Sequence, residues 1–483
     1  MQFKIHTLNS DGKKLILDYD NETNALSTET GHIFYDPPKE KSEFKTSIPF
    51  SKVDPRGKSS KIEIIKIQLG LSCNYSCGYC SQRFVERPTE TSKKDVESFI
   101  EQINVLDFDE KTGLKIELWG GEPMVYWKTL VPLVEALQEK FASWKNKPRF
   151  SMITNGSLLT PEKGYWLMTN DFTVAISHDG PAQHQRGPDP FDDPKLKKTI
   201  LDFWKQMHRM GRISFNSMLT ASNTSRKEIH DWFIKLTDDP SVVLGEGGIV
   251  DAYDEGGFAS LLDTKTKHFA FRKQAFNDIY STSGDVGFKQ IVGKIDSFIN
   301  NVYSQKPATS VGQKCGMDSE NIIAVDLRGN ILTCHNTSSV ETSFNGESHL
   351  IGTVAKIDEA KLTTATHWRN RPHCAACPVL HLCSGSCMFL EGKNWTESCA
   401  NAYSDNVALF SLAIEKITKG FVPYLIEGGD LPPERADIWG DVFKHIESTP
   451  KQKSFPVKII AVEKNIEVNG VEVYAKSEVM HGV

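Results

Sequence analysis

Residues 71–80 read Leu71-Ser72-Cys73-Asn74-Tyr75-Ser76-Cys77-Gly78-Tyr79-Cys80. Their cysteines are spaced C-x3-C-x2-C, so three thiols stand on one short segment. Three thiolates this close can hold three irons of a four-iron cubane and leave the fourth iron without a protein ligand. An iron with an open position can bind a small molecule and pass it an electron. The spacing therefore indicates chemistry rather than storage of iron.

Structural zinc and a disulfide are the alternatives for these cysteines. Zinc sites favour four ligands in two well-separated pairs, whereas residues 73–80 supply three ligands close together. A disulfide needs an oxidising compartment. Residues 1–6 contain neither the apolar core nor the cleavage site of a signal peptide. The run therefore favours an iron–sulfur cluster.

Size and charge narrow the class of protein. The 483 residues leave room for two or three domains. A net charge of −6 argues against a general nucleic-acid binder, which would carry a basic surplus. No apolar run approaches the ~20 residues that span a bilayer. We expect a cytoplasmic protein with reduced thiols and with neither a nucleic-acid nor a membrane partner.

The first 60 residues predict a small, separate β-rich region. Residues 3–6 and 15–19 alternate apolar with polar side chains, and residues 9–12 between them favour a turn. The polar stretch that follows, which includes Pro37 and Pro38, predicts a linker or a strap over the surface.

From about residue 61 to 250 the sequence predicts strands that alternate with helices. We expect helices at 92–106, 127–142 and 195–210. The expected strands are 62–69, 114–119, 150–153, 173–177, 213–219 and 242–244. Such alternation is typical of a parallel sheet with its site at the carboxyl ends of the strands.

The cysteine run resembles the signature of the radical S-adenosylmethionine (SAM) enzymes. Six strand–helix units fit the partial (β/α)6 barrel, of TIM type, that this resemblance implies. It also implies that the open iron binds the amino and carboxylate groups of SAM. One electron then yields a 5′-deoxyadenosyl radical, which abstracts hydrogen from a C–H bond. Tyr79 matches the family's usual aromatic residue near the adenine.

Residues 119–123 read Trp-Gly-Gly-Glu-Pro and follow the second expected strand. They resemble the family's G-G-E-P motif, which binds the SAM amino group through residues that match Gly120, Gly121 and Glu122. Glycines let a backbone approach a ligand, and a carboxylate suits an ammonium group. A plain Gly-Gly turn before a helix is the alternative.

Further SAM contacts are implied at the ends of later strands. Ser177-His178-Asp179-Gly180-Pro181 resembles the S-x-D-G-P of the family's peptide-modifying branch. The resemblance implies that Asn155, Ser177, Arg186 and Asn216 lie near SAM. Asp179 is either catalytic or a turn-forming residue before glycine, and the sequence leaves both open.

The other seven cysteines follow C-x13-G-x4-C and then C-x2-C-x5-C-x3-C-x11-C. This pattern resembles the SPASM domain, which would span 315–400. The alternative, a zinc ribbon built on Cys374 and Cys377, leaves at least three thiols spare. Besides the SAM cluster, the resemblance implies two auxiliary 4Fe–4S clusters, three clusters in all. The first would be held by Cys315, Cys334 and Cys387, and the second by Cys374, Cys377, Cys383 and Cys399.

Only three cysteines remain for the first auxiliary cluster. Its fourth iron is therefore either open or held by a residue such as Asp318 or His335. In the sulfatase-maturing branch an aspartate follows the cysteine that matches Cys334 and takes a proton from the substrate. Here the next residues are His335 and Asn336, so His335 is a second candidate catalytic residue beside Asp179, or a polar loop residue.

The remaining segments are assigned more coarsely. We expect a helical bridge over 251–314, with its helices in 266–304. A C-terminal part over 401–483 would contain a helix at 401–419 and a hairpin at 455–476 that closes at Asn469-Gly470. The N-terminal 60 residues are a possible peptide-binding region, through addition of a strand.

The resemblance implies a radical SAM oxidoreductase that acts on a ribosomal precursor peptide. The expected outcome is an oxidative cross-link (C–C, C–O or thioether), with flavodoxin or ferredoxin as external electron donor. A formylglycine-forming sulfatase maturase, a peptide epimerase and an enzyme acting on a small molecule are alternatives. A non-enzymatic iron–sulfur electron carrier would explain the cysteines but not residues 120–122.

Overall fold

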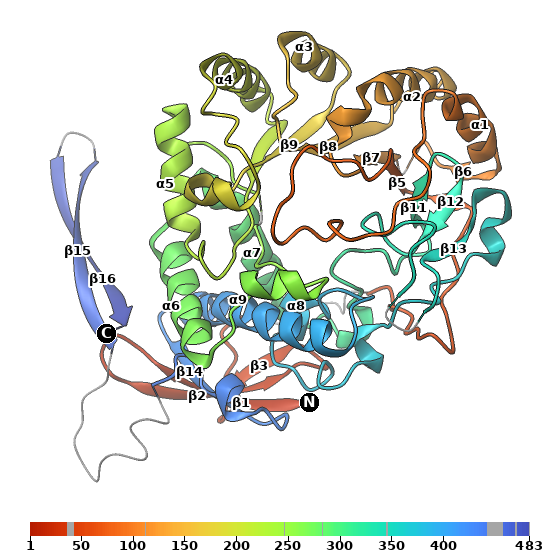
Figure 1. Ribbon diagram of the computed structural model, residues 1–483. Helices are drawn as coiled ribbons and strands as arrows, with labels where there is room; N and C mark the ends of the chain where they lie inside the picture. The colour runs from red at the N-terminus through yellow and green to blue at the C-terminus, as the bar shows by residue number, and fades with distance from the viewer. Residues whose placement is uncertain are drawn as a thin grey trace.

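The computed structural model describes residues 1–35, 43–111, 113–245, 247–282, 284–343, 346–441, 457–468 and 471–482, the last two ranges by their backbone alone. Its largest sheet has the strand order β10-β9-β8-β7-β5-β11-β12-β13. A second sheet has the order β14-β1-β2-β3. Figure 1 shows the large sheet curving inside a row of helices, with the second sheet at the opposite side of the molecule.

Five neighbouring strands of the large sheet are parallel, as the alternating pattern predicted. They are β5 (Ile64–Gln68), β7 (Lys115–Trp119), β8 (Arg149–Thr154), β9 (Thr173–Ser177) and β10 (Ile213–Asn216). The helices between and after them lie along the outside of the curve (Figure 1): α1 (Asp95–Gln102), α2 (Trp127–Lys140), α3 (Pro161–Thr169), α4 (Pro194–Arg209) and α5 (Arg226–Thr237). The predicted partial barrel is therefore confirmed in outline.

Two predicted strands differ from the structure. Residues 242–244 form no strand and make only a parallel bridge from Leu244 to Phe215. Glycines follow at 245, 247 and 248, and Gly247 has a φ of +49°, which ends any extended run. The predicted strand 62–69 is divided at Glu63 into β4 (Lys61–Ile62), which pairs with β6 (Asp107–Phe108), and β5.

The cysteine-rich region continues the barrel sheet, which the sequence did not predict. β11 (Ile322–Asp326) pairs in parallel with β5, and β12 (Asn330–Leu332) and β13 (Leu350–Thr353) follow antiparallel. Gly329 turns the chain between β11 and β12 with a φ of +77°, which explains a glycine within the cysteine pattern. The loop with Cys334 is therefore fixed to the strand that carries the first three cysteines.

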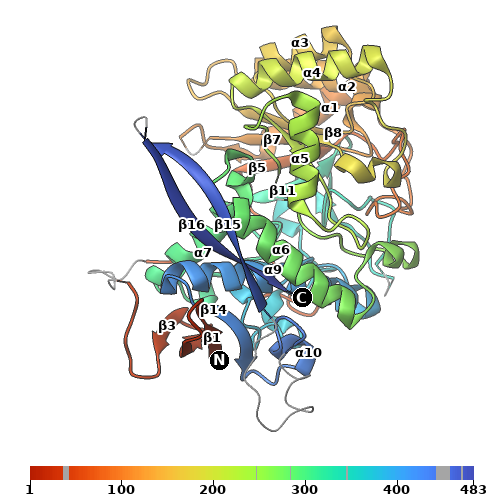
Figure 2. The same cartoon turned by 90° about the vertical axis from the view of Figure 1, so that its left-hand side faces the viewer.

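The N-terminal strands are β1 (Gln2–Leu8), β2 (Lys14–Asp20) and β3 (Ala25–Thr28), and they confirm the two strands predicted there. They are not isolated, because β1 pairs with β14 (Val422–Glu427) from the far end of the chain. The Tyr19 ring packs on Phe410 of the long helix α9 (Gly392–Thr418) with centroids 5.4 Å apart. Figure 2 shows this sheet lying against α9.

The C-terminal half adds further helices. The predicted helical stretch 266–304 is two helices, α6 (Lys265–Thr282) and α7 (Lys289–Tyr303). Helix α9 begins at Gly392, nine residues before the predicted start, and ends before Lys419, whose φ is +58°. Short helices α8 (Leu380–Cys383) and α10 (Pro433–Ala436) flank it in sequence.

The predicted C-terminal hairpin is confirmed by β15 (Val457–Val468) and β16 (Val471–Gly482), which pair antiparallel. Its predicted turn, Asn469-Gly470, lies outside the described residues. In the part of the chain that the structure describes, no helix combines the length and the apolar character needed to cross a bilayer.

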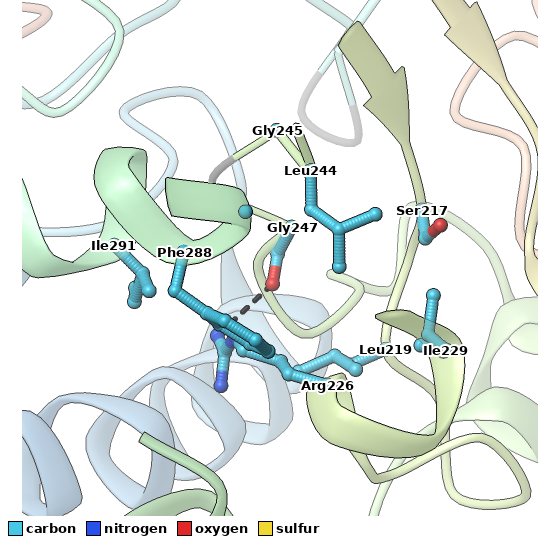
Figure 3. A pocket seen from close by; sticks show the side chains of 10 residues that line it. Ser217, Leu219, Arg226, Ile229, Leu244, Gly245, Gly247, Phe288 and Ile291 are labelled. Atoms are coloured by element: carbon cyan, nitrogen blue, oxygen red, sulfur yellow. Dashed lines mark hydrogen bonds between the residues drawn. The ribbon is translucent and has the colours of Figure 1, made fainter. Parts of the chain in front are cut away.

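A buried ion pair links the barrel to the C-terminal helix. Arg226 at the start of α5 donates from Nη2 to both carboxylate oxygens of Asp405 on α9, at 2.9 and 3.0 Å. Nη2 also donates to the carbonyl oxygen of Gly247 at 2.9 Å, as Figure 3 shows. The two side chains are only 5% and 6% exposed, so each charge depends on the other.

We expect Arg226→Met to destabilise the protein by roughly 3–5 kcal/mol, because it leaves the Asp405 carboxylate buried without a counter-charge. Thermal unfolding would measure this as a lower Tm. Lys198→Met, which breaks an exposed i,i+4 pair with Asp202, is the control and is expected to cost at most about 0.5 kcal/mol. Equal Tm values for the two variants would contradict the role assigned to Arg226.

Candidate active site

The loop after β5 carries the first three cysteines and is held at the carboxyl edge of the sheet. The Gly78 amide donates to the carbonyl oxygen of Gln185 at 3.1 Å. The Tyr75 hydroxyl donates to the carbonyl oxygen of Pro188 at 2.7 Å. Both acceptors belong to the segment that follows β9. The cysteine loop is thus fixed by residues more than one hundred positions away in sequence.

Backbone amides are already directed at two of the thiols. The Tyr75 amide lies 3.3 Å from Cys73 Sγ, and the Gln82 amide lies 3.4 Å from Cys80 Sγ. Burial raises the pKa of Cys77 to about 11. The Cys77 thiol is therefore protonated near neutral pH in the absence of iron, and ligation would release its proton.

The paired glycines after β7 allow the cysteine loop to come close. A Cβ on Gly121 would lie 2.5 Å from the carbonyl oxygens of both Leu71 and Ser72. A Cβ on Gly120 would lie 2.7 Å from the carbonyl oxygen of Gly70. The close approach that requires glycine is therefore to the protein's own backbone.

Glu122 is buried and bonded through both carboxylate oxygens. Oε1 accepts from the Met124 amide at 3.0 Å and from the Thr154 hydroxyl at 2.6 Å, and Oε2 accepts from the Asn155 amide at 2.7 Å. Burial raises its pKa, against these hydrogen bonds. The carboxylate thus joins the ends of β7 and β8, and Oε2 accepts one fewer hydrogen bond than Oε1.

A cavity of about 200 Å³ opens beside these groups. Its wall contains all three thiols together with six of the eight predicted SAM contacts, Gly120, Gly121, Glu122, Asn155, Ser177 and Arg186. The other two, Tyr79 and Asn216, are not in this wall. Asn216 instead lies against Gly245, where a Cβ would come 2.8 Å from its Oδ1.

Tyr79, Asp179 and Arg186 form one buried network behind the cavity. The Tyr79 hydroxyl donates to Asp179 Oδ2, and Arg186 Nη1 donates to the Tyr79 hydroxyl at 2.9 Å and to Asp179 Oδ1 at 3.3 Å. Burial, with the Asp179 carboxylate adding to it, raises the pKa of Tyr79, so the phenol stays protonated. Asp179 thus holds the guanidinium that reaches the cavity, while Arg186 Nε is buried without a partner among the described residues.

His335 and Asn336 take different positions. The His335 ring stacks on Trp119 with centroids 3.8 Å apart, and burial lowers its pKa to about 3. Asn336, which follows it, lies in the cavity wall. No signal in the sequence indicates that Asn336, rather than His335, lines the cavity.

The cavity wall includes further residues that were not predicted as site residues. Trp119, at the end of β7, and Ile153, near the end of β8, both line it. Gln82, Arg83 and Arg87 lie two, three and seven positions after the third cysteine. Their closeness to Cys80 in sequence is the signal that could have found them.

The seven other cysteines form two groups. Four of them line a single small cavity, Cys374, Cys377, Cys383 and Cys399. Arg435 Nη2 lies 3.5 Å from Cys399 Sγ. A separate cavity of about 720 Å³ also includes Cys399 in its wall.

The second group contains the three thiols left over. Burial raises the pKa of Cys334 to about 12, and the nearby Cys315 thiol adds to it. Burial raises the pKa of Cys387, and the Asp251 carboxylate and the Cys334 and Cys315 thiols raise it further. Every cysteine is free of a disulfide. No three His, Cys, Asp or Glu side chains among the described residues converge on a single-ion site. Three thiols thus line the cavity after β5, and four line a second, separate cavity.

Comparisons with known proteins agree with this geometry. Residues 67–219 match the family described as Radical SAM superfamily. The chain is 23% identical over 357 residues to the radical SAM cyclopropyl synthase TigE of Paramaledivibacter caminithermalis, which covers 68% of each protein. It is 22% identical over 369 residues to a serine-type anaerobic sulfatase-maturating enzyme of Bacteroides thetaiotaomicron, covering 66% of this chain and 80% of that enzyme.

A solved structure shares the fold. Native anSMEcpe with bound AdoMet and the Cp18Cys peptide superposes with a TM-score of 0.52 at 18% identity, covering 74% of this chain and 99% of that one. The resemblance inferred from the cysteine run is therefore confirmed, since residues 67–219 match the radical SAM family. Members of that family bind a 4Fe–4S cluster and SAM.

We expect Gly121→Ala to displace the cysteine loop, because the new methyl group meets two backbone oxygens that no rotamer change can move. The variant should purify with less iron and bind SAM more weakly. Gly293→Ala in α7, where a Cβ meets nothing within 4 Å, is the control. Full iron loading and unchanged SAM affinity in Gly121→Ala would contradict the role given to this contact.

Proposed function

We propose that this radical SAM enzyme modifies a residue of a ribosomal precursor peptide and forms an oxidative cross-link, C–C, C–O or thioether. The observation that carries the proposal is that three thiols share one cavity with six predicted SAM contacts, while four more thiols line a second cavity. A cross-link removes two hydrogens, one as an atom and one as a proton and an electron. Two auxiliary clusters would receive that electron.

The residues around the cavity suit the cofactors that the family uses. Cys73, Cys77 and Cys80 would hold three irons of the SAM cluster. This cluster and SAM, when bound, would supply a 5′-deoxyadenosyl radical that abstracts hydrogen. Glu122 and Arg186 carry opposite charges on one cavity wall. This pairing suits the ammonium and carboxylate ends of an amino acid such as the methionyl part of SAM.

Arg186 would act as a positioned cation. Asp179 and the Tyr79 hydroxyl fix its Nη1, and its Nε remains without a partner in the described structure. A carboxylate that entered the cavity would meet a guanidinium already held in place, so little side-chain entropy would be lost on binding. Asp179 is then a positioning residue, because it acts through Arg186.

Sulfatase maturation is the second candidate, since a sulfatase-maturating enzyme is among the similar proteins. That chemistry needs a base at the position of His335. Here the imidazole is buried against Trp119 and is absent from the cavity wall, so it is not placed to take a proton from a substrate in the cavity. This geometry favours cross-linking over formylglycine formation, although the comparisons fit both equally.

An external electron carrier, such as flavodoxin or ferredoxin, would complete the cycle. Cys399 borders both the inner cavity of the four-thiol set and the outer cavity of about 720 Å³. A cluster held there would lie close to solvent, where a redox protein can approach. A plain electron carrier would need no cavity beside its open iron, which argues against that alternative.

Replacing Cys73, Cys77 and Cys80 with alanine is expected to abolish formation of 5′-deoxyadenosine and to remove about one cluster in three from the iron content. Chromatography and iron analysis of anaerobically purified protein would measure both. If the triple variant still makes 5′-deoxyadenosine, the assignment of the SAM cluster is wrong.

Coexpression with a precursor peptide encoded beside the gene is expected to yield a product lighter by about two mass units, the two hydrogens lost on oxidation. Serine oxidation to formylglycine gives the same mass change, so the product is also treated with a hydrazide. A cross-linked product forms no hydrazone. When that product is fragmented in the mass spectrometer, cleavage between the two joined residues releases no separate pieces, because the cross-link still connects them. A hydrazone would favour sulfatase-type chemistry, and an unchanged mass would favour epimerisation.

A further inference from the structure

The four-thiol set lies directly beside the large outer cavity. Its members line one small cavity, and four is the number of protein ligands that closes a four-iron cubane, so this donor set fits such a cluster. This step rests on the proposed function, which assigns a cluster to these thiols. One of the four, Cys399, also lies in the wall of the outer cavity of about 720 Å³. Cys399 is therefore the ligand at the boundary between the two cavities.

Arg435 stands at the same boundary, because it lines both cavities. Its Nη2 donates to Cys399 Sγ at 3.5 Å. Sulfur is larger than oxygen, so a hydrogen bond to it is correspondingly longer. The guanidinium also lies 5.1 Å from the centre of the Tyr403 ring. Since arginine is always protonated in proteins, a fixed positive charge contacts one ligating sulfur.

The backbone on both sides of Arg435 is held by two buried side chains. Arg272 Nη1 donates to three carbonyl oxygens in the segment 434–438, at 3.0, 3.1 and 3.3 Å. The Tyr403 hydroxyl donates to the carbonyl oxygen of Arg435 at 2.6 Å. These contacts fix where the guanidinium starts. They use only backbone atoms of the segment, so a different side chain at position 435 leaves them in place.

A cationic donor at this sulfur affects the two redox states of the cluster differently. A hydrogen bond from a charged donor is stronger than a neutral one and favours the more negative acceptor. Reduction adds one electron to the cluster, and hydrogen bonds to the sulfurs are among the factors that set its reduction potential. The contact with Arg435 therefore stabilises the reduced cluster more than the oxidised one.

We propose that Arg435 is a positioning residue that acts through Cys399. Its hydrogen bond stabilises the reduced state of the cluster held by the four thiols and raises the reduction potential of that cluster. The cluster then accepts the electron that the substrate releases and passes it to an oxidised flavodoxin or ferredoxin on the side of the outer cavity. One electron enters and one leaves, so no further oxidant is needed.

The test uses the full chain with Cys73, Cys77 and Cys80 replaced by alanine, so that only the auxiliary clusters remain. Redox titrations followed by electron paramagnetic resonance compare the form that retains Arg435 with Arg435→Met and Arg435→Lys. We expect Arg435→Met to shift the potential of one auxiliary cluster to a more negative value and to leave the other unchanged. Arg435→Lys keeps the charge without the planar fork of donors, so its potential should fall between the two.

Lys265→Met is the matched control. Lys265 lines the same outer cavity, is 73% exposed and pairs with Glu434 at 3.6 Å, so the variant removes one positive charge from this cavity at a distance from the thiols. Its shift is expected to be much smaller than that of Arg435→Met. Unchanged potentials in Arg435→Met would overturn the proposal. So would an equal shift in Lys265→Met, or an equal shift of both clusters in Arg435→Met.

Arg435→Gln decides the question if Arg435→Met fails to assemble the cluster, because glutamine lacks the charge and still offers an N–H donor. Its potential is expected to be more negative than that of the form with Arg435. Equal potentials in these two forms would also overturn the role of Arg435.

These potentials are measured without SAM cleavage, so they separate this inference from the proposed function. Two auxiliary clusters whose potentials do not respond to residue 435 would refute the role of Arg435 and leave the function standing. Iron for fewer than two auxiliary clusters in the form with Arg435 would refute the cluster assignment on which both depend.

Discussion

The close approach of residues 120–121 to the backbone of residues 70–72 determines the geometry of the active site. Carbonyl oxygens occupy the space where Cβ atoms would stand, so only glycine allows the end of β7 to meet the cysteine loop. The Gly121 and Glu122 amides then donate to the carbonyl oxygens of Gly70 and Ser72 at 3.0 Å. Thiols and predicted SAM contacts are brought to one cavity by this contact between neighbouring strand ends.

The same sheet continues into the cysteine-rich region. β11 pairs with β5, the strand before Cys73, and β12, which ends just before Cys334, pairs with β11. Trp119 and His335 stack across the space between them. The Arg226–Asp405 pair fixes α9, which contains Cys399, to the same barrel. The cysteine-bearing segments are therefore held by one connected framework.

Local signals in the sequence predicted the parts of the fold that depend on neighbouring residues. Apolar runs followed by glycine identified β7, β8 and β9 and the residues at their ends. Pairings between distant segments were beyond such signals, because the partner of β1 is β14 and the partner of β5 is β11. Side-chain direction was equally hidden: His335 and Asn336 are adjacent, yet only Asn336 reaches the cavity.

The central claim is that one iron on the Cys73, Cys77 and Cys80 loop lacks a protein ligand and binds SAM there. Electron–nuclear double resonance on the reduced protein with ¹⁵N- and ¹⁷O-labelled SAM tests it most directly. The account predicts hyperfine coupling of both labels to one cluster, and none when these three cysteines are alanine. A reduced cluster without coupling to either label, or zinc in place of iron in the purified protein, would contradict it.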